Sequence, residues 1–420
     1  MKRLSLDTRF RIDYNKILLA ILFFFMHNCF YLVDPSYKIM GILGYYDFLF
    51  AYCLFLFVFY LLIYPRDYFK GHFSKVILFI PIIILFSSFM AAINYEQSIL
   101  PGILTQRAWL ITMLIYFPLM SLIRNGKLNF ESFLAILFGV VFIELVLYFI
   151  QYYIGESNMF LNVLYNYRYG TIRLYTDTAY MSILLAFATV KFMNRENILK
   201  NSFYIISILS YIFIVNKGRS ISMLLLLTIV LIIFLNKSNI FYKIIVMIIA
   251  CFFGFYVFLQ TETVQEFIAI IFQNADDGTY NVRLQSQQYY LSKLFSTSGA
   301  WLFGFGYPNT NNFNSMAATG ADFGYLIADN GIYGFLFCYG LLGGLWYLYS
   351  LLVQIRYSTR LLFKNRDSAM VVTVIIGLAS IATNVQFFYS YYSFYSVLVF
   401  IAIELLLRKY QDNNKIRLRG

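Results

Sequence analysis

The stretch Phe133–Ile154, FLAILFGVVFIELVLYFIQYYI, decides the fold class of this chain. Its only charged side chain is Glu144, and the run is long enough to cross the hydrocarbon core of a bilayer as a helix. A helix satisfies its own backbone hydrogen bonds, which lipid cannot do. The stretch therefore predicts a transmembrane helix with an ionisable group near its centre.

The composition extends this prediction to the whole chain. Of 420 residues, 61% are hydrophobic and 12% are charged, about half the charged share of a soluble domain. The mean hydropathy is +0.70. A soluble enzyme, a nucleic-acid-binding module and a secreted disulfide scaffold are excluded. We expect an all-α polytopic membrane protein that forms a single transmembrane domain over 1–420.

About twelve apolar runs are candidate spans. They cover roughly 17–33, 42–64, 76–93, 107–123, 133–154, 178–193, 202–216, 220–235, 241–259, 331–353, 369–386 and 388–407. Short polar or aromatic breaks divide the pairs in 202–235 and 369–407, and several runs are near the lower length limit. Misreading one break would change the count and reverse the orientation of every later span.

The distribution of basic residues predicts the orientation. With the N-terminus inside, 24 of the 32 Lys and Arg fall on the inner side and eight on the outer side. This asymmetry follows the positive-inside rule and puts both termini in the cytoplasm. The first run is followed by Asp34-Pro35 rather than by a small-residue cleavage site, so we expect it to be a retained span.

One outer loop stands out by its length. Residues 260–330 connect the ninth and tenth spans, and 155–177 form a second outer segment. Long connections in an otherwise economical chain usually carry function. Within the long loop the apolar spacing predicts a helix over about 281–295, ended by Gly299. Residues 301–306 (WLFGFG) are typical of a segment at the bilayer edge.

Four outer arginines run against the orientation rule and are candidates for binding a pyrophosphate: Arg168, Arg173, Arg219 and Arg283. The guanidinium group donates two parallel hydrogen bonds and stays charged, which suits phosphate oxygens. Each of these arginines could equally be a solvated loop residue or contact a phospholipid headgroup.

Three carboxylates are candidates for proton transfer. Asp329 lies just before the tenth span and Asp177 just before the sixth, where partial burial would raise the pKa toward that of a general base. Both could instead cap the helices that follow them. Glu144, inside a span, is a functional candidate by default or else shares a structural hydrogen bond with a neighbouring helix.

Aromatic and amide side chains in the outer segments are candidate sugar-binding groups. Tyr169, Tyr289 and Tyr290 offer ring faces and Asn309 offers an amide, although a coding bias toward Tyr, Phe and Asn would give the same enrichment. The chain has two His and four Cys without metal-ligand spacing, so we expect neither a metal site nor another cofactor.

Three local patterns resemble the bacterial Wzy-type polysaccharide polymerases of the O-antigen polymerase and ligase superfamily. Gly218-Arg219-Ser220 is similar to their (G/S)-R-(S/T) motif. Arg283 followed by a helix and residues 301–306 resembles their "R…lfGxG" loop, and 329–343 resembles the passage into the next span. The plan of about twelve spans and one large outer loop matches as well.

The resemblance implies a GT-C-like membrane glycosyltransferase in the bacterial plasma (inner) membrane. Its substrate would be an undecaprenyl-pyrophosphate-linked oligosaccharide in the lipid bilayer, with a chain-length regulator and a flippase as further partners and no nucleic acid. It implies that Arg219 and Arg283 hold the pyrophosphate, helped by Arg168 and Arg173. Asp329 would be the first candidate base and Asp177 the second, in a metal-independent, inverting transfer.

Other functions remain open. O-antigen ligases carry a functional His where the large loop meets the next span, but this chain has Asp329-Asn330 there and no His after residue 72. A flippase or transporter of lipid-linked oligosaccharides would show repeated halves and mid-membrane charges, and Glu144 is the one central charge in the bundle. A SEDS-type cell-wall polymerase shares the general plan but not its sequence motifs.

Overall fold

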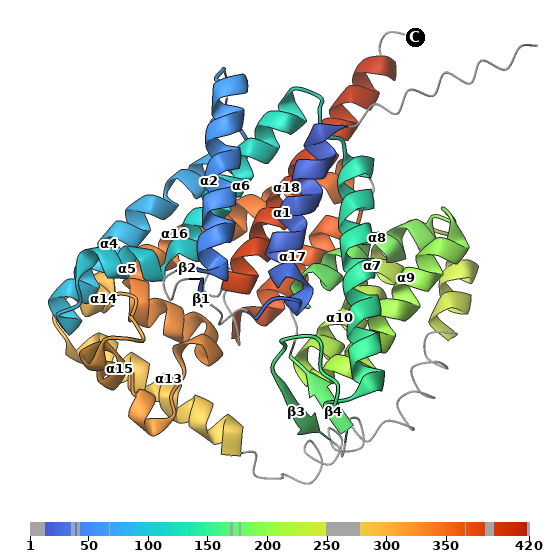
Figure 1. Cartoon of the computed structure of the whole chain (residues 1–420). Helices are drawn as coiled ribbons and strands as arrows, with labels where there is room; N and C mark the ends of the chain where they lie inside the picture. Colours follow the sequence, from blue (N-terminus) through green and yellow to red (C-terminus); the bar gives the residue numbers. More distant parts are fainter. Residues whose placement is uncertain are drawn as a thin grey trace, which may run out of the picture.

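The fold is described from a computed structural model, which covers residues 13–34, 38–39, 43–66, 68–168, 171–175, 178–248, 278–365, 367–382 and 390–417. These residues are almost entirely helical (Figure 1). The first half of the chain contains α1 (Tyr14–Met26), η1 (Asn28–Tyr31), β1 (Lys38–Ile39), β2 (Leu43–Gly44), α2 (Tyr45–Ile63), α3 (Ser74–Leu78), α4 (Ile80–Tyr95), α5 (Ile99–Thr105), α6 (Arg107–Arg124), α7 (Phe130–Ile154), β3 (Tyr165–Arg168), β4 (Thr171–Leu174) and α8 (Ala179–Met193).

The second half is also helical. It contains α9 (Ile198–Ser210), η2 (Tyr211–Asn216), α10 (Arg219–Leu235), α13 (Gly278–Ser296), α14 (Ala300–Phe303), α15 (Phe313–Ala318), η3 (Ala321–Phe323), η4 (Ile327–Asn330), α16 (Gly331–Asn365), α17 (Ala369–Ala379), η5 (Ser380–Ala382) and α18 (Ser390–Arg417). Residues 240–248 are helical too. The helix predicted over 281–295 is therefore present as α13.

The helices pack around a shared apolar core. α6 lies against α2 and α18, while α8 contacts α9, α10, α17 and α18. The long helix α16 joins α17 and α18 to the loop helices α13 and α14. Large side chains such as Phe23, Phe133 and Tyr116 are fully buried among them.

Five helices in the described part of the chain are long and apolar enough to cross a membrane. They are Ser74–Tyr95, Arg107–Arg124, Phe130–Ile154, Ile198–Asn216 and Ile327–Lys364, and shorter apolar helices accompany them. The chain is thus a helical membrane protein. A described helix coincides with at least part of every predicted span, but coincidence with a helix is not a membrane crossing, so the count of twelve remains a prediction.

The first helix is shorter than the sequence predicts. α1 ends at Met26, and the four residues Asn28–Tyr31 all have positive φ angles between 49° and 58°. Left-handed turns of non-glycine residues are strained and need support from their surroundings. Here η1 is buried, and the Tyr31 carbonyl accepts a hydrogen bond of 2.7 Å from the Asn162 N–H, in the connection between α7 and β3.

The segment 155–177, which the charge distribution predicts to be outside, contains a hairpin that the sequence analysis does not predict. β3 and β4 pair antiparallel, with Asn166 opposite Arg173 and Tyr167 opposite Ile172. Ile172 and Leu174 of β4 are buried, whereas Tyr165 and Tyr167 of β3 are exposed, so the hairpin packs on the bundle through β4 and β3 is its exposed strand. Because β4 contacts η2, the hairpin positions Arg173 at the break between α9 and α10.

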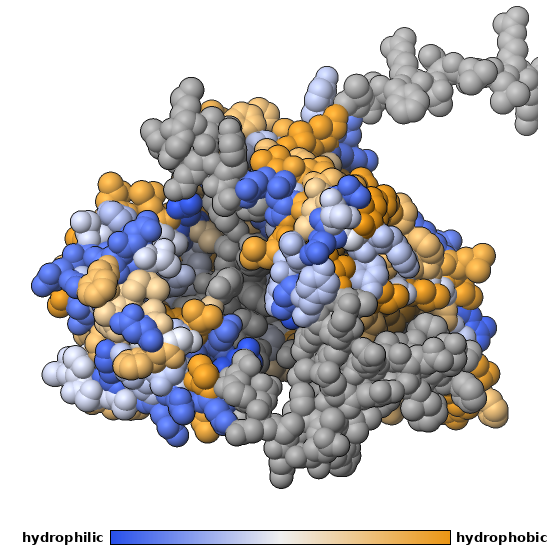
Figure 2. All heavy atoms as spheres, turned by 60° about the horizontal axis from the view of Figure 1, so that its bottom comes forward, coloured by the Kyte–Doolittle hydropathy of each residue, from blue (hydrophilic) through white to orange (hydrophobic). Residues whose placement is uncertain are grey.

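The two ends of the bundle differ. β3, β4, α13 and α15 lie at the end opposite to the C-terminus (Figure 1). Figure 2 turns this end forward and shows hydrophilic residues interspersed with hydrophobic ones. At the other end, Glu131 of α7 pairs with Lys191 of α8 at 3.3 Å and with Lys409 of α18 at 2.7 Å. We refer to these as the hairpin end and the C-terminal end.

Candidate functional site

Arg173 is anchored at the hairpin end by three contacts. Its Nε donates a hydrogen bond of 2.7 Å to the backbone carbonyl of Asn216, and Nη1 donates one of 3.2 Å to the Tyr175 hydroxyl. The guanidinium carbon also lies 4.3 Å from the centre of the Tyr175 ring. Asn166 fixes that hydroxyl from the other strand with a hydrogen bond of 2.7 Å. Arg173 is therefore held in one orientation rather than free in solvent.

The break at 216–219 is a tight, buried turn. η2 ends in a wide helical turn, Lys217 has a positive φ of 50°, and α10 starts at Arg219. A Cβ on Gly218 would lie 2.6 Å from the side-chain oxygen of Asn216 and 2.7 Å from a methyl of Ile221. Only glycine fits here without a shift, which gives a steric reason for the glycine before Arg219.

Lys217 is a functional candidate that the sequence analysis does not assign. Lys217 is only 5% exposed, although a lysine at the end of an apolar helix normally reaches into water. The ammonium group lies 5.5 Å from the centre of the Tyr152 ring. The sequence feature that could have identified Lys217 is its position in Lys-Gly-Arg-Ser, at a very short break between two apolar runs. Sequence alone, however, cannot distinguish a buried lysine from an exposed one.

The two elements that carry Arg283 and Asp329, α13 and η4, are joined by a buried link. The Ser286 hydroxyl, one turn after Arg283, donates a hydrogen bond of 2.7 Å to the side-chain oxygen of Asn330. Asn330 is 1% exposed and donates to the Leu326 carbonyl at 2.8 Å. The Nε of Arg283 is buried and has no hydrogen-bond partner among the described residues. This donor is therefore available to an added acceptor.

The two loop tyrosines differ in accessibility. Tyr289 is partly buried against Phe323 and Tyr325, and its hydroxyl donates to the Ala318 carbonyl at 3.0 Å. Tyr290 is 1% exposed and packs on Phe337. Burial raises the pKa of the Tyr290 hydroxyl well above its ordinary value, and the charge of Asp329 adds to this effect.

Asn309 organises the loop that follows α14. Its N–H donates to Gln97 at 2.8 Å, and its carbonyl accepts from the Ser315 hydroxyl at 2.7 Å. Its side-chain oxygen accepts from the Asn311 N–H at 3.0 Å, which leaves the side-chain NH₂ group as its available donor.

Several predicted site residues lie outside the described part of the chain. Tyr169 and Asp177 are among them, as are the side chains of Arg168 and Arg219. The backbone nevertheless places Arg168 in β3 and Arg219 at the start of α10. Because Arg173 bonds the Asn216 carbonyl, Arg173 and Arg219 start from neighbouring positions.

The predicted site residues thus form two groups at the same end of the molecule. Arg173 and the backbone of Arg219 lie at the turn 216–219, beside Lys217, which the sequence analysis does not assign. Arg283 lies on α13 and Asp329 in η4, two elements in contact. The hairpin and α13 are at the same end in Figure 1. Among the described residues, no three His, Cys, Asp or Glu side chains are placed to hold a metal ion. The chemistry this arrangement offers is binding of an anion by fixed cations, with a carboxylate nearby.

Glu144, the ionisable group inside the central span, has two partners. His27 Nδ1 lies 2.7 Å from one carboxylate oxygen, and the Tyr148 hydroxyl donates to the other at 2.7 Å. The His27 ring stacks on Tyr180 with centroids 4.0 Å apart. Glu144 therefore makes the structural hydrogen bond to a neighbouring helix that was its alternative role. The His27 Nε2 is buried without a partner among the described residues.

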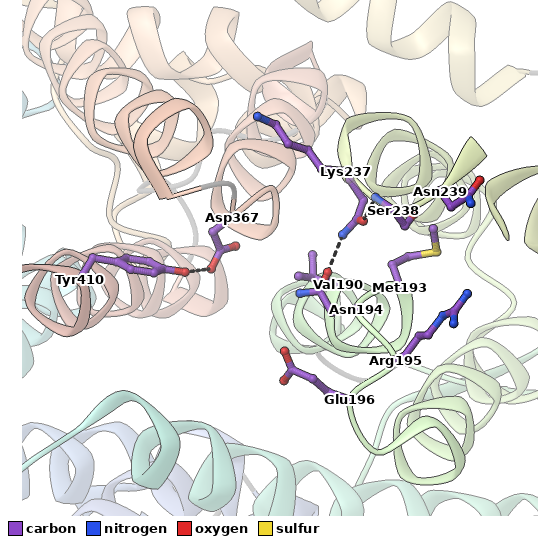
Figure 3. A pocket seen from close by; sticks show the side chains of 11 residues that line it. Val190, Met193, Asn194, Arg195, Glu196, Lys237, Ser238, Asn239, Asp367 and Tyr410 are labelled. Carbon is purple, nitrogen blue, oxygen red and sulfur yellow. Dashed lines mark hydrogen bonds between the residues drawn. The ribbon is translucent and has the colours of Figure 1, made fainter. Parts of the chain in front are cut away.

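A cavity of about 570 Å³ opens at the C-terminal end, between α8, α10 and the connection from α16 to α17 (Figure 3). Asn236 donates to Asn194 at 3.0 Å on one side of it. On the other side the Tyr410 hydroxyl donates to Asp367 at 3.3 Å. Cationic and anionic groups both line this cavity, so its charge does not favour one sign of ligand.

No family model and no curated protein matches this chain.

Proposed function

We propose that this protein is a membrane glycosyltransferase that polymerises lipid-linked oligosaccharide repeat units. The growing glycan would leave its undecaprenyl pyrophosphate carrier and join the nonreducing-end hydroxyl of another lipid-linked unit. The observation that supports this most is the anchoring of Arg173 on the Asn216 carbonyl, which brings a second arginine to the turn carrying Gly218-Arg219. Two adjacent arginines suit the oxygens of a diphosphate.

The reaction needs charge stabilisation on the departing group. The acceptor oxygen attacks the anomeric carbon as the bond from that carbon to the pyrophosphate oxygen breaks, and the configuration inverts. Negative charge then accumulates on the pyrophosphate, where fixed cations lower the barrier. Arg219 and Arg283 are the proposed pyrophosphate ligands, Arg173 and Arg168 assist, and Lys217 adds a fifth cation near the turn.

The acceptor hydroxyl must also lose a proton. Asp329 is the proposed base because it lies in η4, which contacts α13, the helix that carries Arg283. Asp177 is the second candidate. Tyr169, Tyr289 and the Asn309 amide are proposed to contact sugars. Because Tyr290 is buried in the present arrangement, it would contact a sugar only after the loop rearranges.

The experiment is elongation by the purified full-length chain in phospholipid vesicles, supplied with synthetic undecaprenyl-pyrophosphate repeat units and no other protein. We expect longer glycans from the wild type. Arg219→Ala and Arg283→Ala should each lower the rate by roughly 100-fold, the usual effect of removing one charge-stabilising donor. Arg173→Lys keeps the charge but not the bonds to Asn216 and Tyr175 together, so a loss of about tenfold is expected.

Arg107→Ala is the matched control, because it removes an arginine from the predicted outer side that is paired with Asp47 at 3.6 Å. It should retain the wild-type rate. Wild-type chain length and yield in both Arg219→Ala and Arg283→Ala would contradict the site assignment. No elongation by folded wild-type protein would contradict the polymerase itself.

A second candidate, a flippase for the same lipid-linked oligosaccharides, is favoured by the buried His27 and Glu144 pair. Ionisable pairs inside a membrane domain are typical of proton-coupled transport. The same vesicles distinguish the two functions. Movement of labelled substrate across the bilayer without elongation, lost in Glu144→Gln, would support the flippase.

A further inference from the structure

A second cavity at the C-terminal end is lined by cations from four different helices. It measures about 600 Å³ and lies between α3, α6, α16 and α18. Lys75, Arg124, Arg356 and Arg408 line it, one from each helix in that order. Like charges from separate elements repel one another, so their convergence on one cavity favours binding of an anion there.

The carboxylate within this cavity does not provide that compensation by direct pairing. Glu404 is 4% exposed, and one of its oxygens accepts bonds from the His72 N–H at 2.6 Å and the Tyr116 hydroxyl at 2.9 Å. The other oxygen lies 2.6 Å from His72 Nδ1. Both oxygens are thus hydrogen-bonded to His72 and Tyr116, which together with Glu404 we call the floor of the cavity. Among the described residues, Lys75 and Arg356 have no ion-pair partner, and Arg408 has the exposed Asp412 at 3.4 Å.

The floor is rigid. The Tyr116 hydroxyl accepts the Phe73 N–H at 3.2 Å while donating to Glu404. A Cβ on Gly71 would lie 2.3 Å from that hydroxyl, so the 71–73 segment packs directly on Tyr116. The His72 ring also meets the edge of Tyr357 with centroids 4.5 Å apart. A preformed site of this kind binds without an ordering cost.

An apolar stripe leads away from the basic groups along α16. Leu345, Tyr349 and Leu352 follow one helix face that continues to Arg356, and they are 53%, 40% and 55% exposed. Tyr349 itself lines the cavity. The cavity therefore joins a cationic end to an exposed hydrophobic strip, which matches an amphiphile with an anionic headgroup and acyl chains.

We propose that this cavity binds the phosphate of an anionic phospholipid, with the acyl chains lying along Leu345, Tyr349 and Leu352 of α16. The arginines would bind the phosphate oxygens by paired hydrogen bonds, and Lys75 would add a point charge. The site is separate from the arginines of the proposed active site and does not depend on the proposed function. The apolar stripe favours a lipid over free phosphate.

The test uses the full-length chain in nanodiscs of phosphatidylcholine, with or without phosphatidylglycerol. We expect phosphatidylglycerol to raise the thermal midpoint and to be retained after detergent washing, as counted by native mass spectrometry. Arg356→Gln combined with Arg408→Gln should lower retention about tenfold. Arg360→Gln combined with Lys364→Gln removes the same charge from α16 outside the cavity and should retain wild-type binding.

Two results would overturn the proposal. Equal loss of phosphatidylglycerol from both double variants would show a diffuse surface effect rather than a site. Stabilisation of the wild type by inorganic phosphate, equal to that by phosphatidylglycerol, would assign the cavity to a soluble anion. The comparison of lipid and phosphate uses the wild type alone, so it decides the question even if a variant does not fold.

Discussion

Among single residues, Asp367 has the environment that most clearly predicts a pH dependence. It lies between α16 and α17, where its carboxylate accepts the Ala369 N–H at 3.0 Å and the Tyr410 hydroxyl at 3.3 Å (Figure 3). Burial raises the pKa of this carboxyl above its ordinary value, although both hydrogen bonds act in the opposite direction. The folded state therefore holds the proton more tightly than the unfolded chain does.

The sign of the resulting prediction follows from this raised pKa. A carboxyl with a raised pKa in the folded state stabilises the fold at low pH, and this contribution is lost as the pH rises through the folded-state value. Asp367→Asn keeps an oxygen for the Ala369 N–H but cannot ionise. We expect the variant to gain thermal stability relative to wild type as the pH rises from about 4 to about 8.

The measurement is the thermal midpoint of both proteins in one detergent over that pH range. Asp322→Asn removes an exposed carboxylate and controls for the loss of charge alone. A constant difference between Asp367→Asn and wild type at every pH would contradict the prediction.

At the same scale, the sequence identified the chemistry of the candidate residues better than their surroundings. Arg173 was selected because an outer arginine opposes the orientation rule, but its partner, the Asn216 carbonyl, lies 43 residues away. The burial of Lys217 and the pairing of Glu144 with His27 also depend on contacts between distant helices. Residue type indicates what a side chain can do, whereas tertiary packing decides what it touches.

Among the elements, α16 and the segment after α14 form one interlocked unit. Gly340 has a φ of 60° within α16, and the helix is kinked there. The carbonyls of Phe337 and Cys338 accept hydrogen bonds of 2.8 and 3.0 Å from the N–H groups of Phe305 and Gly306. The WLFGFG segment, which we expect at the bilayer edge, thus supplies donors to carbonyls of α16 just before its kink.

Gly304 tests this interlocking. Gly304 and Gly299 have similar positive φ angles of 76° and 79°. A Cβ on Gly304 would lie 2.5 Å from the Cys338 backbone, whereas a Cβ on Gly299 meets nothing within 4 Å. Their ψ angles differ, because Gly299 (ψ −16°) is in the left-handed helical region and Gly304 (ψ 179°) is in a region that almost only glycine adopts. We expect a backbone strain of roughly 1–2 kcal/mol in Gly299→Ala and of about 1–3 kcal/mol in Gly304→Ala. We expect Gly304→Ala to lose about 1–3 kcal/mol more, because the backbone of α16 cannot move aside cheaply.

Urea or thermal unfolding of the two variants in the same detergent provides the measurement. Gly299→Ala is the control for a side chain at a positive φ without a close contact, so the difference between the variants reports the contact with α16 together with the different ψ of Gly304. Equal destabilisation by both substitutions would mean that α14 and α16 separate without cost.

The sequence predicted the helices better than it predicted the segments that connect them. The apolar runs located the long helices. The apolar spacing inside the long loop predicted α13, because helix formation there depends on local periodicity. The β3–β4 hairpin was not predicted, since its short strands are stabilised mainly by Ile172 and Leu174 packing on the bundle. The left-handed turn at Asn28–Tyr31 has no glycine to indicate it and exists because tertiary contacts hold it.

For the molecule as a whole, orientation follows from the charge distribution and can be tested directly. Lys and Arg concentrate on one side of the predicted bundle, which would place the hairpin end outside and the C-terminal end in the cytoplasm. The native Cys29, Cys53 and Cys338 are buried, and Cys251, which lies outside the described residues, is replaced by Ser in the labelling background, so added thiols at exposed positions can be distinguished.

Single cysteines at four exposed asparagine or lysine positions therefore predict a definite labelling pattern. We expect a membrane-impermeant maleimide to label Asn158→Cys and Asn314→Cys in intact cells, and Asn239→Cys and Lys364→Cys only after permeabilisation. Asn239 follows α10, so its side depends on whether α9 and α10 cross the membrane separately at the 216–219 turn. If Asn239→Cys were labelled in intact cells, that turn would not join two crossings. The arginines gathered there could then not face the same side as Arg283, and the two groups of the proposed site would be separated by the bilayer.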